Sequence, residues 1–222
     1  MAPHRFKAFV FDAYGTLFDV ASVAAACEAL FPGHGALLAR HWRDKQLQFT
    51  WLRSLMRRHA PFDVVTAQGL QAACDVLGLD ARKAIEARLA DEYLRLRAFP
   101  EVAETLRALA GRPRLILSNG TPRMIGAALD HAALGGLIDE VLSVEAVGIY
   151  KPDPRIYALA TERLGLPAQE IAFVSSNGWD IAGAASFGLH TIWVNRAGLP
   201  AEPLDHGPAL VVPDLRGVLT LA

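Results

Sequence analysis

Five short apolar runs without polar alternation most constrain the fold of this chain. They are rich in Val, Ile, Leu and Phe and span residues 8–11, 115–117, 141–144, 171–174 and 191–194. A strand that is covered on both faces has this pattern, whereas a strand with one solvated face alternates apolar and polar residues. Helix-length segments separate the later runs, at residues 124–133, 154–164 and 179–187. The pattern predicts a doubly wound, Rossmann-like α/β core with a parallel sheet and right-handed crossovers.

The section between residues 19 and 98 differs from the rest because it contains no strand-like run. It has the pattern of about four helices, including a long one over residues 36–58. We therefore expect a helical cap domain, residues 19–98, inserted after the first strand of an α/β core domain formed by residues 1–18 and 99–222. A cleft would separate the two parts.

Composition excludes several classes of partner. The 222 residues carry 22 basic and 23 acidic side chains, and the scattered positive charges form no footprint for nucleic acid or an anionic membrane surface. No apolar stretch approaches the roughly 18 to 20 residues of a membrane span, and the N-terminus lacks a signal-peptide plan. The two cysteines, Cys27 and Cys74, have no CxxC spacing and are expected to be reduced and buried. These features predict a cytoplasmic protein with no nucleic-acid or membrane partner.

Polar residues follow the predicted strands at their carboxyl ends. Asp12 ends the first run, Ser118 and Asn119 end the second, Lys151 comes after the third, and residues 175–180 (Ser-Ser-Asn-Gly-Trp-Asp) follow the fourth. Each alone reads as an ordinary turn or cap residue. Together they bring two carboxylates, hydroxyls, an amide and an ammonium to the edge where such sheets bind ligands, which predicts an active site there.

Four segments carry a family resemblance. In order and spacing, "DAYGT", "SNG", "KPDP" and "SSNGWDIAGAASFG" resemble the motifs of the haloacid dehalogenase superfamily, and in particular those of the (S)-2-haloacid dehalogenases. The similarity runs through essentially the whole chain, including "HWRDKQLQFTWLR" in the predicted cap. It implies hydrolysis of short (S)-2-haloacids to (R)-2-hydroxyacids and halide.

Two positions separate this chain from the phosphatases of that superfamily. Phosphatases have a second Asp two residues after the nucleophile, which protonates the leaving alcohol; here Tyr14 occupies that position. A halide leaves as a stable anion and needs no proton. The phosphatases also have acidic magnesium ligands in the fourth motif, where this chain has Ser176, so a hard divalent cation lacks charged oxygen ligands. We expect neither metal nor cofactor.

The resemblance assigns a two-step mechanism. Asp12 would attack C2 of the substrate in an SN2 displacement and form an aspartyl ester, with inversion at C2. Water would then attack the ester carbonyl and regenerate the carboxylate, with Asp180 as base and Lys151, Ser175 and Asn177 around it. Two carboxylates in one pocket resist double ionisation unless a cation lies between them, which is a physical role for Lys151.

The other candidate residues surround this centre. The Thr16 hydroxyl can turn back onto Asp12, and the backbone amides of Ala13 and Tyr14 can hold the substrate carboxylate or an oxyanion. Following the resemblance, Ser118 joins the carboxylate site, Asn119 and Arg43 receive the halide, Tyr157 orders Lys151 or the substrate pocket, and Trp179 forms a pocket wall. Arg43 comes from the cap, so cap closure would complete the site.

Other activities stay open at this point. The same aspartyl-ester chemistry could open a strained ring amine. A magnesium-dependent phosphatase is a further alternative, which Tyr14 and Ser176 disfavour. A non-enzymatic binding module would require the carboxylates to be vestigial. The aromatic-rich stripe of the cap, and the dimeric state that the family resemblance implies, favour a homodimer. The preferred halogen, the chain length, turnover of fluoroacetate and the physiological substrate are not encoded in any motif.

Overall fold

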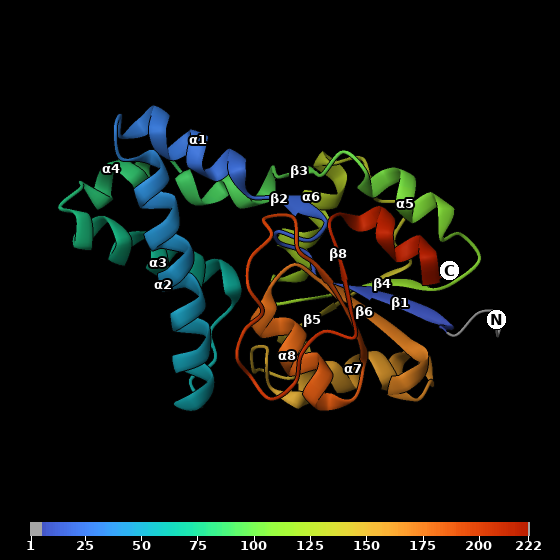
Figure 1. Cartoon of the computed structure of the whole chain (residues 1–222). Helices are drawn as coiled ribbons and strands as arrows, with labels where there is room; N and C mark the ends of the chain where they lie inside the picture. Colours follow the sequence, from blue (N-terminus) through green and yellow to red (C-terminus); the bar gives the residue numbers. More distant parts are fainter. Residues whose placement is uncertain (1–5, 222) are drawn as a thin grey trace.

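The computed structural model describes residues 6–221 and contains a six-stranded, all-parallel sheet (Figure 1). Across the sheet the strand order is β5 (Glu140–Ser143), β4 (Arg114–Ser118), β1 (Ala8–Phe11), β6 (Ile171–Ser175), β7 (His190–Val194) and β8 (Leu210–Val212). The central strands β1 and β6 are buried along their whole length, which explains why their sequences show no alternation.

Helices cover both faces of the sheet. In Figure 1, α7 (Pro154–Leu164) and α8 (Gly178–Phe187) lie below it, and α5 (Val102–Ala108) and the 3₁₀ helix η4 (Leu215–Leu221) lie above. The remaining core helix α6 (Pro122–His131) begins at Thr121, whose hydroxyl accepts a hydrogen bond from the Met124 amide. Two short 3₁₀ turns complete the core, η2 (Val144–Ala146) and η3 (Ala168–Glu170). The predicted doubly wound fold is confirmed.

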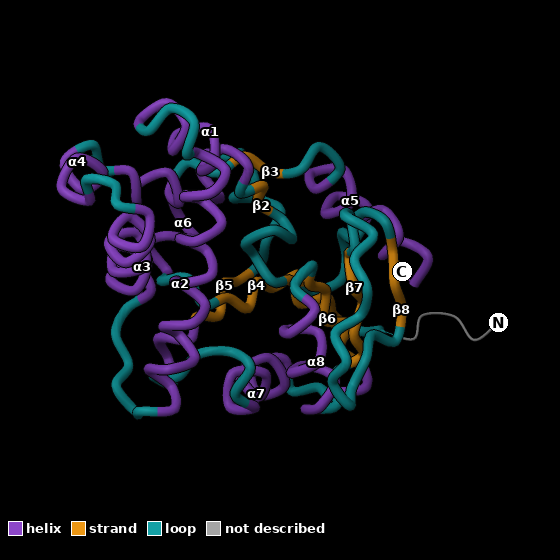
Figure 2. Tube along the Cα trace, turned by 60° about the vertical axis from the view of Figure 1, so that its left-hand side comes forward, coloured by secondary structure: helices purple, strands orange, loops and turns teal. Residues whose placement is uncertain are grey.

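A group of helices stands beside the sheet and forms the cap (Figure 2). It consists of α1 (Ala21–Leu30), α2 (Gly35–Leu55), α3 (Phe62–Leu77), α4 (Ala81–Glu86) and the 3₁₀ helix η1 (Leu89–Leu94). Within it, α2 and α3 are tied by Trp42, whose indole donates to the Thr66 carbonyl, and by Gln46, which donates to the Thr66 hydroxyl. Gly69 of α3 permits this contact, because a Cβ there would lie only 3.1 Å from the Gln46 nitrogen.

The chain leaves the core and returns to it side by side. The strands β2 (Phe18–Asp19) and β3 (Arg97–Ala98) pair antiparallel at the junction with the cap.

One predicted boundary was wrong: the long cap helix ends at Leu55, three residues earlier than expected. Arg57 adopts a left-handed backbone, and the Arg58 amide bonds to the Arg53 carbonyl, which is the geometry of a helix C-terminal stop.

Candidate active site

A buried ammonium joins two carboxylates at the carboxyl edge of the sheet. Lys151 Nζ lies 3.1 Å from Asp12 Oδ1 and 2.9 Å from Asp180 Oδ2. The side chains of Lys151 and Asp180 are fully buried and that of Asp12 is 8% exposed. Asp12 follows β1, Lys151 precedes α7 and Asp180 lies in the first turn of α8, so the fold brings three separate segments of the chain together.

This triad sets the charge of the site. Burial alone would lower the pKa of Lys151, but the adjacent Asp12 and Asp180 outweigh burial and raise it, so the ammonium stays charged. Burial raises the pKa of Asp180 to about 6, with Lys151 opposing the shift and Asp12 adding to it. Asp180 is therefore a carboxylate near neutral pH that can accept a proton, which suits a general base.

The second oxygen of Asp12 has two donors of its own. Thr16 Oγ1 donates to Asp12 Oδ2 at 3.1 Å, and Asn177 Nδ2 donates to the same oxygen at 2.8 Å. Asn177 also contacts the Tyr14 carbonyl at 3.3 Å. Both Asp12 oxygens are thus held by hydrogen bonds, and the carboxylate has one fixed orientation.

The turn after Asp12 supports this arrangement. Gly15 has φ +82°, a conformation that side chains with a Cβ disfavour, and it lets the chain reverse so that Thr16 faces Asp12. The Ser176 amide donates to Thr16 Oγ1 at 2.9 Å, which orients the hydroxyl. In the described chain the amides of Ala13 and Tyr14 donate to no other residue, so they are free for a ligand.

Tyr157 contacts Asp180 and makes no hydrogen bond to Lys151. Its hydroxyl donates to Asp180 Oδ1 at 2.8 Å and lies 3.2 Å from the Asp180 carbonyl oxygen. Burial raises the pKa of Tyr157 well above its ordinary value, so it remains a donor. The sequence interpretation connected Tyr157 with Lys151 or the pocket; the structure connects it with the second carboxylate instead.

Three predicted residues hold the loops of the site. Ser118 Oγ accepts a hydrogen bond from the Gly120 amide at 3.0 Å, and Ser175 Oγ accepts one from the Asn177 amide at 3.1 Å. Asn119 Oδ1 accepts the Lys151 amide at 3.2 Å, which leaves its NH₂ group without a partner in the described residues. None of these side chains touches Asp12 or Asp180 through a hydrogen bond.

The cap covers the site with one cation and an aromatic cluster. Arg43 is half-buried and donates to the buried Gln46 at 2.7 Å. The Tyr14 ring lies 5.7 Å from the rings of both Phe62 and Tyr93, and the positive charge of Arg43 acts on both tyrosines. Arg43 therefore faces the core at the Tyr14 side of the site.

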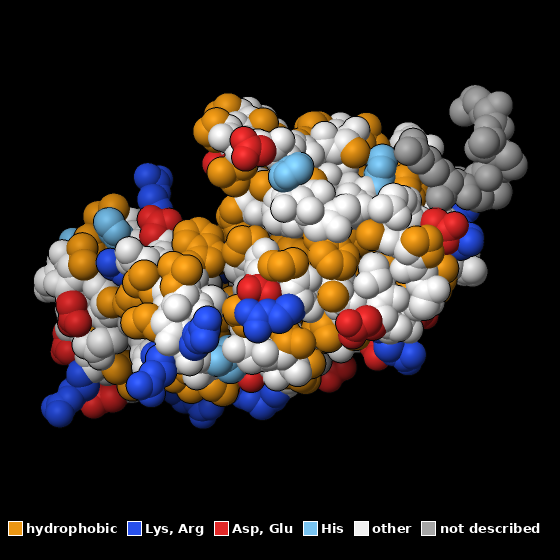
Figure 3. All heavy atoms as spheres, turned by 90° about the horizontal axis from the view of Figure 1, so that it is seen from below, with side chains coloured by type: hydrophobic (Ala, Val, Ile, Leu, Met, Phe, Trp, Pro, Cys, Tyr) orange, Lys and Arg blue, Asp and Glu red, His pale blue; other side chains and the backbone are white. Residues whose placement is uncertain are grey.

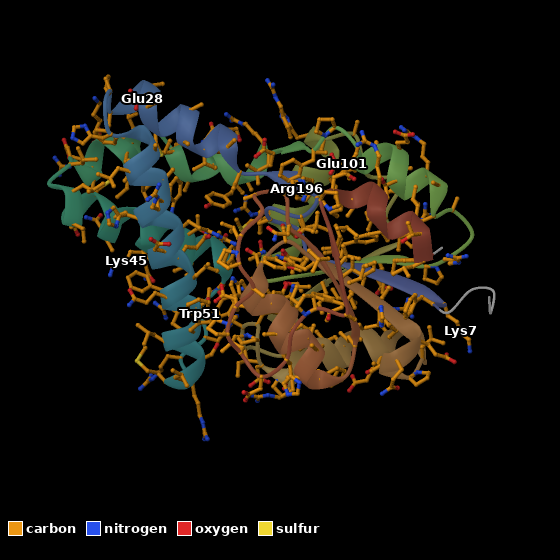
Figure 4. All side chains as sticks on the ribbon, in the orientation of Figure 1. Lys7, Glu28, Lys45, Trp51, Glu101 and Arg196 are labelled. Carbon is orange, nitrogen blue, oxygen red and sulfur yellow. The ribbon has the colours of Figure 1, made fainter. Side chains whose placement is uncertain are left out.

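Trp179 forms a wall shared by both parts. Its ring packs edge-on against Trp51 of α2, with ring centroids 5.7 Å apart. Figure 4 shows Trp51 projecting from α2 toward the core. Trp51 was not singled out by the sequence, because an aromatic residue in an amphipathic helix usually indicates packing within its own domain.

Sequence reasoning also missed Arg196, which lies after β7 beside Glu101 (Figure 4). Its guanidinium donates to the carbonyls of Gly15 and Thr16 and to Glu101 Oε1, at 3.4, 3.1 and 2.6 Å, and stacks 3.8 Å from the Phe99 ring. Arg196 thus ties the turn after Asp12 to the segment that returns from the cap. The only signal was its position just after the fifth apolar run of the sequence.

The donor set suits an ammonium better than a metal ion. Among residues 6–221, no group of three or more His, Cys, Asp or Glu side chains could hold a metal. Asp12 and Asp180 already share Lys151 Nζ, and Ser176 bonds to Thr16, so a hard divalent cation would have to displace the ammonium from both carboxylates. The absence of a metal requirement stays a prediction.

Comparison with known proteins places this geometry in a family. The haloacid dehalogenase-like hydrolase family matches residues 6–188. The chain belongs to this family. Its members are hydrolases, and the chain is accordingly an enzyme of that class.

Individual dehalogenases match over nearly the whole chain. An (S)-2-haloacid dehalogenase from Pseudomonas sp. (strain YL) is 47% identical over 97% of this chain and 94% of its own length. The haloacetate dehalogenase H-2 from Moraxella sp. (strain B) is 40% identical over 98% of both chains. A solved structure, the L-2-haloacid dehalogenase from Xanthobacter autotrophicus with chloropropionic acid covalently bound, is 40% identical, covers 97% of this chain and 98% of its own, and superposes with a TM-score of 0.91.

Proposed function

We propose that this haloacid dehalogenase-like hydrolase converts short (S)-2-haloacids and water into (R)-2-hydroxyacids and halide. The observation that carries the proposal is the buried Asp12–Lys151–Asp180 triad, in which one carboxylate is fixed for attack and the other has a pKa of about 6. The haloacid dehalogenases that match nearly the full chain support it, and one of them is solved with chloropropionic acid covalently bound.

In the first step, Asp12 attacks C2 of the substrate. A bond forms between a carboxylate oxygen and C2 while the carbon–halogen bond breaks, and its electron pair leaves with the halide. The amides of Ala13 and Tyr14, which donate to no other described residue, and Ser118 bind the substrate carboxylate. Arg43 and Asn119 receive the halide, and Trp179 closes the pocket.

In the second step, water attacks the ester carbonyl of Asp12. Asp180 accepts the proton of this water, and Lys151 balances the negative charge that develops. The bond between the Asp12 carbonyl carbon and the substrate oxygen then breaks, and the leaving alkoxide takes the proton from Asp180. Asp12 releases its remaining proton to solvent and is again a carboxylate. Tyr157 holds Asp180 at 2.8 Å, while Thr16 and Asn177 hold the carboxyl group of Asp12. Ser175 keeps the Asn177 loop in place. The carbon–oxygen bond at C2 survives, so the configuration set by inversion is retained in the product.

Isotope labelling tests this scheme directly. Excess enzyme is mixed with (S)-2-chloropropionate in H₂¹⁸O and quenched after one turnover. The expected lactate contains mostly unlabelled oxygen at C2, because that atom comes from Asp12, and the label appears in the enzyme. Full labelling of the first-formed lactate would show direct attack by water and overturn the covalent step.

The division of labour between the domains is also part of the proposal. We assign residues 1–18 and 99–222 to the core and residues 19–98 to the cap, with the β2–β3 pair at their junction. In this view the cap supplies Arg43 and excludes water during displacement. Limited proteolysis that cleaves near residues 19 and 98 and releases a helical fragment would support the boundaries.

A homodimer and a cytoplasmic location complete the proposal. Figure 3 views the molecule from below, where the end of α2 projects and apolar side chains reach the surface. Leu55 and Met56, at that end, are 81% and 61% exposed, which favours a partner surface.

Cys27 and Cys74 are buried free thiols, as in a reducing compartment. In the described chain, no helix combines the length and apolarity of a membrane span. Light scattering and cell fractionation test these two points.

A further inference from the structure

We propose that the Tyr14 hydroxyl donates a hydrogen bond to the departing halide and thereby helps to determine which halogens the enzyme releases. This inference rests on the proposed dehalogenase function. It gives Tyr14 a side-chain role in addition to the role of its backbone amide.

The observation behind it is a buried hydroxyl without a partner. Tyr14 is 3% exposed, and its hydroxyl oxygen has no hydrogen-bond partner among the described residues. Two of the three other buried tyrosines donate their hydroxyls to protein partners: Tyr150 to the Ala60 carbonyl and Tyr157 to Asp180; the Tyr93 hydroxyl interacts with Gln46. A buried polar group without a partner is costly, so its position calls for a ligand that accepts a hydrogen bond.

The surroundings identify that ligand as an anion. The Tyr14 hydroxyl lies against Gly120, where an added Cβ would be only 2.8 Å from it, and Gly120 directly follows Asn119. The Asn119 NH₂ group has no described partner, and Arg43 approaches Tyr14 from the cap closely enough for its charge to act on it. Tyr14 and Asn119 thus offer two donors from neighbouring loops, and Arg43 adds a positive charge from the cap.

The chemistry needs a donor here that keeps its proton. As the bond from C2 to the halogen breaks, the halogen takes the electron pair and gains a full negative charge, which a hydroxyl hydrogen stabilises without transfer. Burial raises the pKa of Tyr14 well above its ordinary value, with Tyr93 adding to the effect, so the group remains protonated. The aromatic rings of Phe62 and Tyr93 hold the phenol in place.

Leaving-group dependence distinguishes this role from a structural one. Tyr14→Phe keeps the ring contacts and removes the hydroxyl. In single-turnover experiments we expect chloride release from (S)-2-chloropropionate to slow by about 10- to 100-fold, the range for one hydrogen bond to a charged group. Bromide release from (S)-2-bromopropionate should slow several times less, because bromide is a weaker acceptor and a better leaving group. Hydrolysis of the ester should keep its rate.

Tyr93→Phe is the matched control, because Tyr93 is buried in the same cluster and packs edge-on against Tyr14. Any effect of this variant should be equal for both halogens. Tyr14→Met, which fills the cluster without a donor, replaces the Phe variant if the latter does not fold. An equal loss for chloride and bromide in the Tyr14 variant, or no loss, overturns the inference. Failure of the wild-type enzyme to release either halide would instead overturn the proposed function.

Discussion

The core side and the cap side of the site consist of different kinds of side chain. On the core side, Asp12, Lys151 and Asp180 are buried and connected by hydrogen bonds, with Thr16, Asn177 and Tyr157 as further donors. On the cap side, the surroundings are the aromatic rings of Phe62 and Tyr93, the indole of Trp51 and the half-buried cation Arg43.

This difference indicates which steps of the reaction each side serves. A nucleophile and a base must hold their geometry through a bond-forming step, and a saturated hydrogen-bond network provides this rigidity. A departing anion and an apolar alkyl group need a dry pocket that opens again for product release. Substitutions in the core-side network should therefore affect both chemistry and stability, whereas removal of the half-buried Arg43 on the cap side should affect chemistry alone.

Asp12→Asn gives the largest expected effect. An amide cannot attack C2, so halide release should fall by at least about 1000-fold, as expected for loss of a covalent nucleophile. Rapid-quench measurement of halide from (S)-2-chloropropionate tests this, with circular dichroism to verify the fold. Retention of full activity would remove the core side from the chemistry.

Lys151→Ala tests the coupling of chemistry to stability. It leaves two buried carboxylates without a cation, so the free energy of unfolding should fall by about 3–5 kcal/mol. Lys7→Ala is the control, because its ion pair with Glu170 is exposed and should contribute no more than about 1 kcal/mol. Urea unfolding at pH 7 measures both; equal small losses would show that the triad does not stabilise the fold.

Arg43→Ala tests the opposite side. Removal of the cap cation should slow halide release by about 100-fold, the effect of losing one charged hydrogen-bond donor. The urea midpoint should change little, since Arg43 is only half-buried. Lys45→Ala on the same helix is the control: Lys45 bonds to Gln48 and in Figure 4 points away from the core. A large stability loss in the Arg43 variant would contradict the division of labour.

The pH dependence of ester hydrolysis probes Asp180. The base acts in its ionised form and its pKa is about 6, so the rate should rise about tenfold per pH unit below 6 and level off above it. Tyr157→Phe removes a hydrogen bond that lowers this pKa, and should move the midpoint upward. Tyr150→Phe removes a hydroxyl that donates to the Ala60 carbonyl and not to Asp180, and should leave the midpoint in place. A midpoint near 4 in the wild type would argue against a buried base.

Arg123→Ala should have the smallest effect. Arg123 of α6 bridges to Asp63 of α3 at 3.1 Å, between core and cap, but both side chains are substantially exposed. Such pairs contribute at most about 1 kcal/mol, so kcat should change by less than about threefold. Steady-state kinetics at low and high salt measure kcat of the variant and of the wild type. A tenfold change in kcat would mean that this ion pair controls cap closure.

Much of the architecture could be predicted from local patterns. Strands β1, β4 and β6 are continuous apolar runs, and α7 begins with Asp153 and Pro154, a capping pair whose carboxylate accepts the Arg155 amide. Strand β8 was missed because its three residues are followed by Pro213 and contain one exposed Val, so neither length nor burial gives a signal. The end of α2 was misplaced because an arginine, rather than a glycine, adopts the left-handed stop.

The sequence by itself determined the chemical groups of the site and the edge on which they lie. Asp12, Asn119, Lys151 and Asp180 follow strand ends, and parallel strands bring their carboxyl ends together. Only the tertiary structure decided which groups touch: that Tyr157 bonds to Asp180, that Arg196 holds the turn after Asp12, and that the Tyr14 hydroxyl has no partner within residues 6–221. Backbone patterns depend on neighbours in sequence, whereas a hydrogen bond between side chains depends on the packing of several elements at once.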